Sequence, residues 1–186
     1  MDRRQLLLIA GAALAAGCSS TPTGPADAGA KRREIDAGVD NALADLYANA
    51  KGARQLASTA KGVLVFPKVV SAGFIVGGSY GQGALRKGTT TAGYYSVGAG
   101  SVGLLAGAQS KAMYLLFMTQ EALSKFEASD GWTVGADASV VVLDAGAEVR
   151  GDTQTAQAPV IGYVRGQSGF MANLSIDGTK FNKLKL

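Results

Sequence analysis

The residue with the clearest chemistry in this 186-residue sequence is Cys18, its single cysteine. It follows a charged head with Arg3 and Arg4, an apolar run over residues 6–16 and a small residue. This order is typical of an export signal that is cleaved before a cysteine, which is then acylated. The apolar run is too short to span a bilayer as a mature helix, and one cysteine forms no internal disulfide. We therefore predict a bacterial lipoprotein precursor with a signal peptide at residues 1–17 and a lipid anchor at Cys18.

The residues after Cys18 indicate where the anchor holds the protein. Ser19 stands where an aspartate usually retains bacterial lipoproteins in the inner membrane, so we predict the outer membrane, facing the periplasm, with surface exposure as an alternative. Residues 18–30 contain prolines and glycines and no large apolar side chain, which is typical of a flexible tether. An ordinary secretory signal with an incidental cysteine is the competing interpretation.

Residues suited to catalysis are few. The sequence has no histidine, which excludes the usual catalytic triads and most zinc sites. Ser58 and Lys61 have the Ser-x-x-Lys spacing of penicillin-recognising enzymes, but the companion motifs of that mechanism are not reproduced. We therefore predict no enzymatic activity and no cofactor, and we keep a hydrolase with an unusual site as the third alternative.

Two further patterns favour structural interpretations. Residues 98–103 spell Gly-x-Gly-x-x-Gly, yet a phosphate cradle needs a helix to follow, and here the pattern indicates more strand. The acidic residues of the second half lack the spacing of a calcium loop, so we expect carboxylates in solvated turns. These are Asp130, Asp137, Asp144, Glu148 and Asp152.

The basic residues are the best candidates for a binding site. They begin where the tether meets the domain and continue to residue 68: Lys31, Arg32, Arg33, Lys51, Arg54, Lys61 and Lys68. Each basic residue near an anionic membrane is worth about 1 kcal/mol of binding, and an ordinary solvated surface is the alternative. The net charge of +4 comes without a dense basic stripe containing aromatic residues, so we predict no nucleic-acid partner.

The elements that must position these residues follow from hydrophobic periodicity. Residues 31–61 carry apolar side chains at three- and four-residue spacing, which predicts one long amphipathic helix ending at Gly62. Residues 119–126 predict a short helix capped by Thr119, with Leu123 and Phe126 turned inward.

The remaining segments predict strands. The first covers residues 63–66 and ends at Pro67, and a turn is expected at residues 86–89. The other strands are expected at residues 72–85, 94–108, 112–118, 133–143, 147–150, 160–165, 170–176 and 180–186.

Glycine defines the expected shape of this sheet. Most of the 26 glycines lie inside the predicted strands, where they are tolerated if a sheet bends sharply or two backbones approach closely. We therefore predict an α+β fold over residues 31–186. It consists of a strongly curved, mainly antiparallel sheet or small barrel, packed with one long N-terminal helix and one short helix.

The strand block resembles the SYLF domain family. The resemblance rests on Ala60-Lys61-Gly62-Val63-Leu64-Val65-Phe66-Pro67-Lys68, followed by the glycine-rich stretch at residues 72–83, and it extends over residues 33–184. Eukaryotic members of this family bind phosphoinositides and, in yeast, actin filaments, whereas bacterial members are commonly predicted lipoproteins. The resemblance implies lipid and protein binding rather than catalysis, and it maps the family's basic lipid-binding helix onto residues 31–61.

Two functions follow from these expectations. The first is a non-enzymatic lipid-binding domain that is anchored to a membrane and recognises anionic phospholipid headgroups through the basic residues. The alternative is a protein-interaction module of the cell envelope, with actin binding toward a host as its most specific form.

Overall fold

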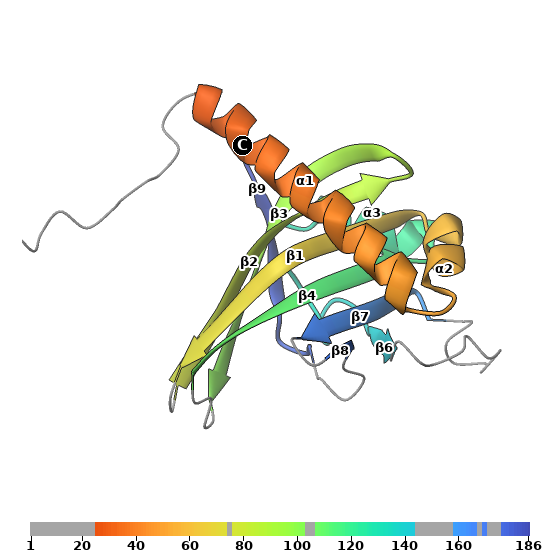
Figure 1. Cartoon of the computed structure of the whole chain (residues 1–186). Helices are drawn as coiled ribbons and strands as arrows, with labels where there is room; N and C mark the ends of the chain where they lie inside the picture. Colours follow the sequence, from red (N-terminus) through yellow and green to blue (C-terminus); the bar gives the residue numbers. More distant parts are fainter. Residues whose placement is uncertain (1–24, 74–75, 103–106, 144–157, 167–168, 171–175) are drawn as a thin grey trace, which may run out of the picture.

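The computed structural model of the chain describes residues 25–73, 76–102, 107–143, 158–166, 169–170 and 176–186 (Figure 1). Three helices are present among them: α1 (Pro25–Asn49), α2 (Ala53–Thr59) and α3 (Gln120–Ala128). The strands are β1 (Gly62–Gly73), β2 (Val76–Lys87), β3 (Thr90–Val102), β4 (Gly107–Phe117), β5 (Trp132–Thr133), β6 (Val141–Leu143), β7 (Val160–Gly166), β8 (Gly169–Phe170) and β9 (Lys180–Leu184).

All these strands belong to one strongly curved sheet. Its order is β5-β9-β3-β2-β1-β4-β7-β6, and β8 pairs with β7 outside this path. Only the β6–β7 pair is parallel among the strand pairs described. The predicted α+β class with a curved, mainly antiparallel sheet is confirmed.

The inner face of the sheet encloses an aromatic core. Strands from both edges and the centre contribute to it, and α3 closes it. Phe126 of α3 meets Trp132 of β5 edge to face, with ring centroids 5.4 Å apart, and Phe181 of β9 packs on the same tryptophan at 5.5 Å. Thr119 accepts a hydrogen bond from the Ala122 backbone N–H at 3.2 Å, so the predicted cap of α3 is confirmed.

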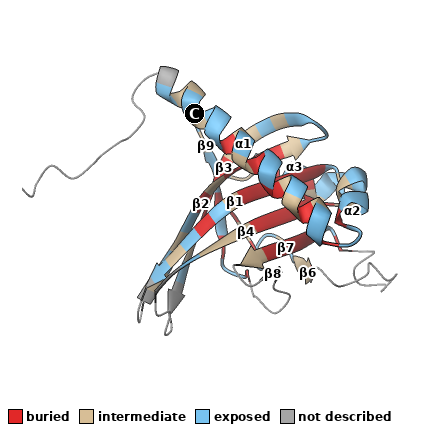
Figure 2. Cartoon of the chain, in the orientation of Figure 1, coloured by how far each residue is buried: buried red, intermediate tan, exposed pale blue. Residues whose placement is uncertain are grey.

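The outer face of the sheet is covered by α1 and α2 (Figures 1 and 2). The buried side of α1 lies at Ile35, Val39, Ala42, Leu46 and Ala50, which is the three- and four-residue spacing of a helix face. These side chains pack on outward residues of β1, β4 and β7. The apolar face predicted for this helix is therefore confirmed, and the sheet occupies it.

The predicted single helix over residues 31–61 is wrong in its extent. The structure breaks it into α1 and α2 at Gly52, whose φ of 77° lies in the left-handed region that favours glycine. Helix α1 also begins earlier, at Pro25, inside the segment expected to be a tether. Proline is favoured in the first turn of a helix, because its missing N–H has no intrahelical partner there.

The prediction that the first strand ends at Pro67 is also wrong. Strand β1 continues to Gly73, and its register with both β2 and β4 shifts around Pro67. This shift is a β-bulge, where a strand tolerates proline because a ladder hydrogen bond is already missing. Gly38 of α1 packs on the same proline: a Cβ there would lie 3.0 Å from its Cγ.

Beyond the bulge, parts of β1, β2, β3 and β4 extend past the helices (Figure 1). We call this part the arm: residues 68–73 of β1, 76–82 of β2, 96–102 of β3 and 107–111 of β4. Val70 and Tyr80 pair across β1 and β2 in the arm and remain 40% and 55% exposed. The arm thus continues the sheet without the helical cover that buries its other half.

Other predicted boundaries differ in part. The expected strand at residues 94–108 is divided between β3 and β4, and the expected strand at 133–143 is divided between β5 and β6 around a bridge from Val134 to Ala138. Strands β7 and β9 match the predictions closely. The strand expected at 147–150 and most of that at 170–176 lie outside the described residues.

Candidate functional site

The predicted anchor, Cys18, lies outside the described residues. The N-terminal segment joins the domain at the first turn of α1, at one end of the molecule (Figure 1). Among the described residues, no helix combines the length and apolar character needed to cross a membrane. The end where α1 begins is therefore the part of the domain nearest to residue 18 along the chain.

The seven predicted basic residues do not form one cluster. Lys31, Arg32 and Arg33 occupy the early turns of α1, whereas Lys51 and Arg54 lie beyond its C-terminal end. At 1.5 Å per residue, Arg33 and the last residue of α1 are about 24 Å apart along the helix axis. This separation exceeds the distance of about 8 Å over which physiological salt screens exposed charges. The first three residues and the last ones therefore have little electrostatic influence on each other.

The remaining predicted residues lie apart from the start of α1. Lys61 is exposed just before β1, with its backbone N–H bonded to the Phe117 carbonyl at 2.7 Å. Lys68 is exposed on β1 at the base of the arm. The guanidinium of Arg54 stacks over the Tyr47 ring, 4.7 Å from its centroid, and the half-buried position of Tyr47 raises its pKa.

Helix α1 as a whole is not basic. Its three basic residues are outnumbered by five acidic ones: Asp27, Glu34, Asp36, Asp40 and Asp45. Lys31 is paired with Glu34 at 3.0 Å, and beyond Arg33 every charged side chain of the helix is a carboxylate. Positive charge on α1 is thus confined to the end where the helix begins.

The carboxylates of α1 fasten the helix to the sheet. Arg86 of β2, with a side chain only 12% exposed, pairs with Asp40 at 2.7 Å and with Asp36 at 3.4 Å. Asp36 also accepts hydrogen bonds from the Thr91 hydroxyl at 2.8 Å and the Tyr94 hydroxyl at 2.7 Å. Burial raises the pKa of Tyr94, and its hydrogen bond to Asp36 adds to this rise. Asp36 and Asp40 therefore serve to hold α1 on the sheet.

The C-terminal residues meet the same end of α1. The Arg32 guanidinium donates to the backbone carbonyl of Leu186, and Leu186 packs at the edge of the outer core. Lys183 and Lys185 in this tail are exposed. The tail therefore ends where α1 begins, and we call this end of the domain the basic end: Lys31, Arg32, Arg33, Lys183 and Lys185. Lys183 pairs with Tyr95 of the inner core, so its side chain lies on the other face of the sheet from α1. The alternation of basic and apolar residues in the tail indicated a strand, but only the fold shows what the tail adjoins.

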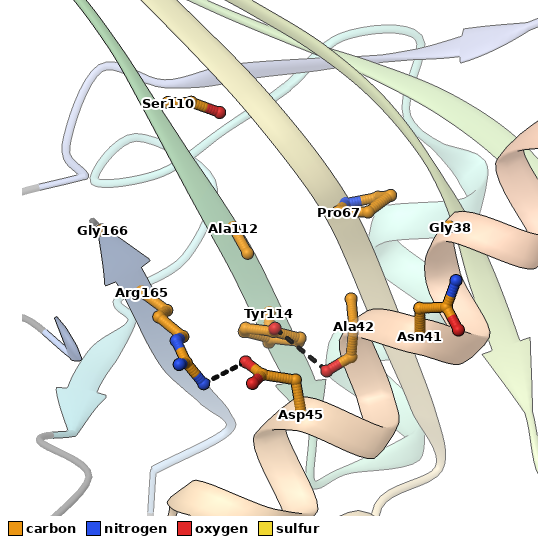
Figure 3. Close-up of a pocket in the computed structure, with 10 residues that line it drawn as sticks. All are labelled: Gly38, Asn41, Ala42, Asp45, Pro67, Ser110, Ala112, Tyr114, Arg165 and Gly166. Atoms are coloured by element: carbon orange, nitrogen blue, oxygen red, sulfur yellow. Dashed lines mark hydrogen bonds and ion pairs between the residues drawn. The ribbon is translucent and has the colours of Figure 1, made fainter. Parts of the chain in front are cut away.

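A pocket of about 550 Å³ opens on the outer face beside α1 (Figure 3). Small residues of α1 and of β1, such as Gly38, Ala42 and Pro67, line one part of it, and Ser110 and Ala112 of β4 line another. An ion pair between Asp45 and Arg165 borders it.

The buried tyrosine of this pocket is held by the helix backbone. The Tyr114 hydroxyl donates to the Ala42 carbonyl at 3.1 Å. Burial, with the charge of Asp45 as a second cause, raises the pKa of Tyr114 to about 12. Tyr114 is therefore a neutral structural group at physiological pH and not a general base.

The other candidate motifs take structural positions. The Ser58 hydroxyl bonds to the Gln55 carbonyl at 2.7 Å within α2, and the chain turns extended at Ala60, so Ser58 and Lys61 are not on one helix. Asp137 accepts a hydrogen bond from the Thr133 N–H at 2.6 Å, which is the turn role predicted for it. The described part of the chain brings no three metal-binding side chains together, and Asp144, Glu148 and Asp152 lie outside it.

Comparison with models of protein families gives a match over the second half of the chain. Residues 98–185 match the family model Ysc84, described as Las17-binding protein actin regulator. No curated protein sequence matches the chain. The matched region runs from the middle of β3 to the end of β9 and contains the aromatic residues of α3, β5 and β9. The chain therefore carries a domain of the Ysc84 family, which is the SYLF family that its sequence resembles.

Proposed function

We propose that this protein is a non-enzymatic, membrane-anchored binding module whose basic end contacts anionic phospholipid headgroups. Acyl chains on Cys18 would hold it at the outer membrane, facing the periplasm. The observation that carries the proposal is the contact between Arg32 and the Leu186 carbonyl, which brings two basic segments together where the N-terminal segment leaves the domain. An anchor attached at that point raises the local concentration of headgroups at the basic end.

The mode of contact is electrostatic. An interfacial amphipathic helix buries its apolar face in the bilayer, but the apolar face of α1 is already occupied by the sheet. Contact through the exposed lysines and arginines needs no unfolding of this interface. At about 1 kcal/mol per basic residue, five residues suffice for salt-sensitive adhesion.

Charge reversal at the two ends of the helical region tests the proposal. The chain from residue 18 onward with Cys18→Ser, which lacks both the signal peptide and the acyl anchor, is sedimented with neutral and anionic vesicles at low and high salt. We expect salt-sensitive binding to anionic vesicles only. Lys183→Glu with Lys185→Glu should weaken it at least about tenfold, and Lys31→Glu with Arg32→Glu and Arg33→Glu should weaken it further.

The matched control carries the same three charge changes at the other end: Lys51→Glu, Arg54→Glu and Lys61→Glu. Its binding should stay close to that of the parent. An equal loss of vesicle binding in both sets of variants would mean that binding depends on net charge and not on the basic end. Unchanged binding in the first set would show that the basic end does not contact the headgroups.

The family description favours a second candidate function, a protein-interaction module that binds actin. The Ysc84 family is described as Las17-binding protein actin regulator. Co-sedimentation with purified actin filaments, without vesicles, tests this candidate. Actin binding that survives reversal of the basic end would support it over the lipid function.

A further inference from the structure

The arm leaves part of one strand without a neighbour. β4 pairs with β1 along its whole length, from Gly107 opposite Gly73 to Phe117 opposite Gly62. On its other side it pairs with β7 only from Ala112 to Phe117. No described strand covers residues 107–111 of β4 on that side, and we call this stretch the open edge. Figure 3 shows β4 continuing past the end of β7 at Gly166.

An open edge of this kind is a template for another extended chain. Its outward backbone N–H and C=O groups can form the same ladder bonds that β7 forms further along. Proteins recognise extended peptides in this way, and side-chain pockets beside the added strand give specificity. The open edge needs such pockets on both faces of the sheet to select a partner.

On the outer face, the pocket described above lies beside the open edge. Ser110 and Ala112 of β4 and Gly166 of β7 line it, and Gly38 and Ala42 of α1 form the opposite wall (Figure 3). An added strand in line with β7 would point alternate side chains at this space. The small wall residues leave room there for uncharged side chains of moderate size.

On the inner face, the open edge carries Lys111. Lys111 pairs in register with Val69, which belongs to the inner core, so its side chain lies on the inner face. It is half-buried, and among the described residues no carboxylate pairs with it. Burial lowers its pKa, and burial is the only cause of this shift. A desolvated ammonium group gains most from an incoming carboxylate.

We propose that the open edge of β4 binds an extended acidic peptide segment of a partner protein as an additional strand. Side chains on one side of the peptide enter the pocket beside α1, and a carboxylate on the other side pairs with Lys111. This site is separate from the basic end, because Lys111 lies on β4 in the arm, with β1, β2 and β3 between it and β9, and because its affinity comes from backbone pairing.

Labelled peptides of about seven residues, blocked at both ends, test the site on the purified full chain by fluorescence anisotropy. The first alternates valine with glutamate, the second valine with lysine, and the third is the first with its central residue replaced by proline. We expect binding of the glutamate peptide and at least about tenfold weaker binding of the other two, since proline removes a ladder donor.

Exchanging charge on the protein gives the decisive comparison. Lys111→Glu should weaken binding of the glutamate peptide and strengthen binding of the lysine peptide. Lys125→Glu, on the exposed side of α3, should leave the affinity for both peptides unchanged. Amide hydrogen exchange should slow at residues 107–111 when the glutamate peptide is bound, which a simple ion pair would not produce.

Three results would overturn the proposal: no binding of any peptide at millimolar concentration, equal binding of the proline peptide, or no change of preference in Lys111→Glu. Vesicle binding by the basic end is measured independently of all three. Failure of the open edge therefore leaves the proposed lipid function untouched, and the reverse also holds.

Discussion

Gly83 of β2 packs directly against the backbone carbonyl of Val65 in β1, and a Cβ atom added to Gly83 would overlap that oxygen. Gly81, two residues earlier, lies similarly close: an added Cβ would be 2.7 Å from the Lys68 carbonyl oxygen. Both contacts flank the bulge at Pro67, where β1 and β2 change register. The absence of these two side chains lets the sheet bend sharply where the helix-covered part becomes the arm.

Gly83→Ala should destabilise the protein by about 2–4 kcal/mol, because the backbone of β1 must move to accept the methyl group. Gly100→Ala in β3 is the matched control, since nothing lies within 4 Å of its Cβ position, and its effect should stay within about 0.5 kcal/mol. Urea unfolding of both variants measures the difference. Equal stabilities would show that β1 and β2 approach less closely than described.

Removal of the Arg86 side chain should lower the free energy of unfolding more than removal of an exposed ion pair does. Arg86→Met leaves Asp36 and Asp40 without their shared partner at the helix–sheet interface, and we expect a loss of about 2–4 kcal/mol. Lys125→Met breaks only the exposed pair with Glu121 and should cost about 0.5 kcal/mol or less. Thermal or urea unfolding separates the two, and a loss below 1 kcal/mol for Arg86→Met would contradict the structural role of the α1 acids.

Tyr114 predicts a loss of stability in alkali. Burial raises the pKa of Tyr114 to about 12 in the folded protein, from the ordinary value of 10.0. Because the folded state holds the proton more tightly, its contribution is fully present below pH 10 and is lost as the pH rises through about 12. Tyr114→Phe should flatten this decline of the free energy of unfolding, whereas Tyr80→Phe, on an exposed side chain, should not. Other buried tyrosines leave a residual slope in both variants.

Thr119→Ala should destabilise α3 by about 1 kcal/mol, since the Ala122 N–H loses its side-chain acceptor. Ser124→Ala on the exposed side of the same helix is the control, and a smaller change is expected there. A near-zero effect of Thr119→Ala in urea unfolding would indicate that water replaces the cap without cost.

Cys18→Ser should abolish incorporation of a labelled fatty acid into the protein and should leave residues 1–17 attached, because acylation and cleavage both need the cysteine. Wild-type protein should stay in the membrane fraction even in high salt, because acyl chains bind through the hydrophobic effect. A Cys18→Ser variant that still incorporates the fatty acid would refute the predicted anchor.

The parts of the fold that local chemistry determines could be predicted. The spacing of Ile35, Val39 and Leu46 defined the buried face of the helix, and Thr119 defined the start of α3. The glycines inside the predicted strands indicated that the sheet is bent, although they did not indicate where. In each case the physical cause acts between residues that are close in sequence.

The errors share the opposite cause. Pro67 predicts the end of a strand, because the bulge opposite Gly83 cannot be seen in the sequence. Gly52 ends the first helix although the helical spacing of apolar residues continues beyond it. Lys185 joins the basic end only because the last strand reaches α1. These features depend on pairing between segments that are distant in the chain, which periodicity and turn residues do not encode.

The position of β9 has a consequence for the order in which the protein can fold. This strand is the last in the chain, yet it lies between β3 and β5 in the sheet, and Phe181 packs on Trp132. A chain that emerges from its N-terminus can pair β1 to β4 early, but it cannot close its aromatic core until residues 180–184 are free to pair. Completion of the core thus waits until β9 has been synthesised, and loss of residues 180–186 would leave the tryptophan open to solvent.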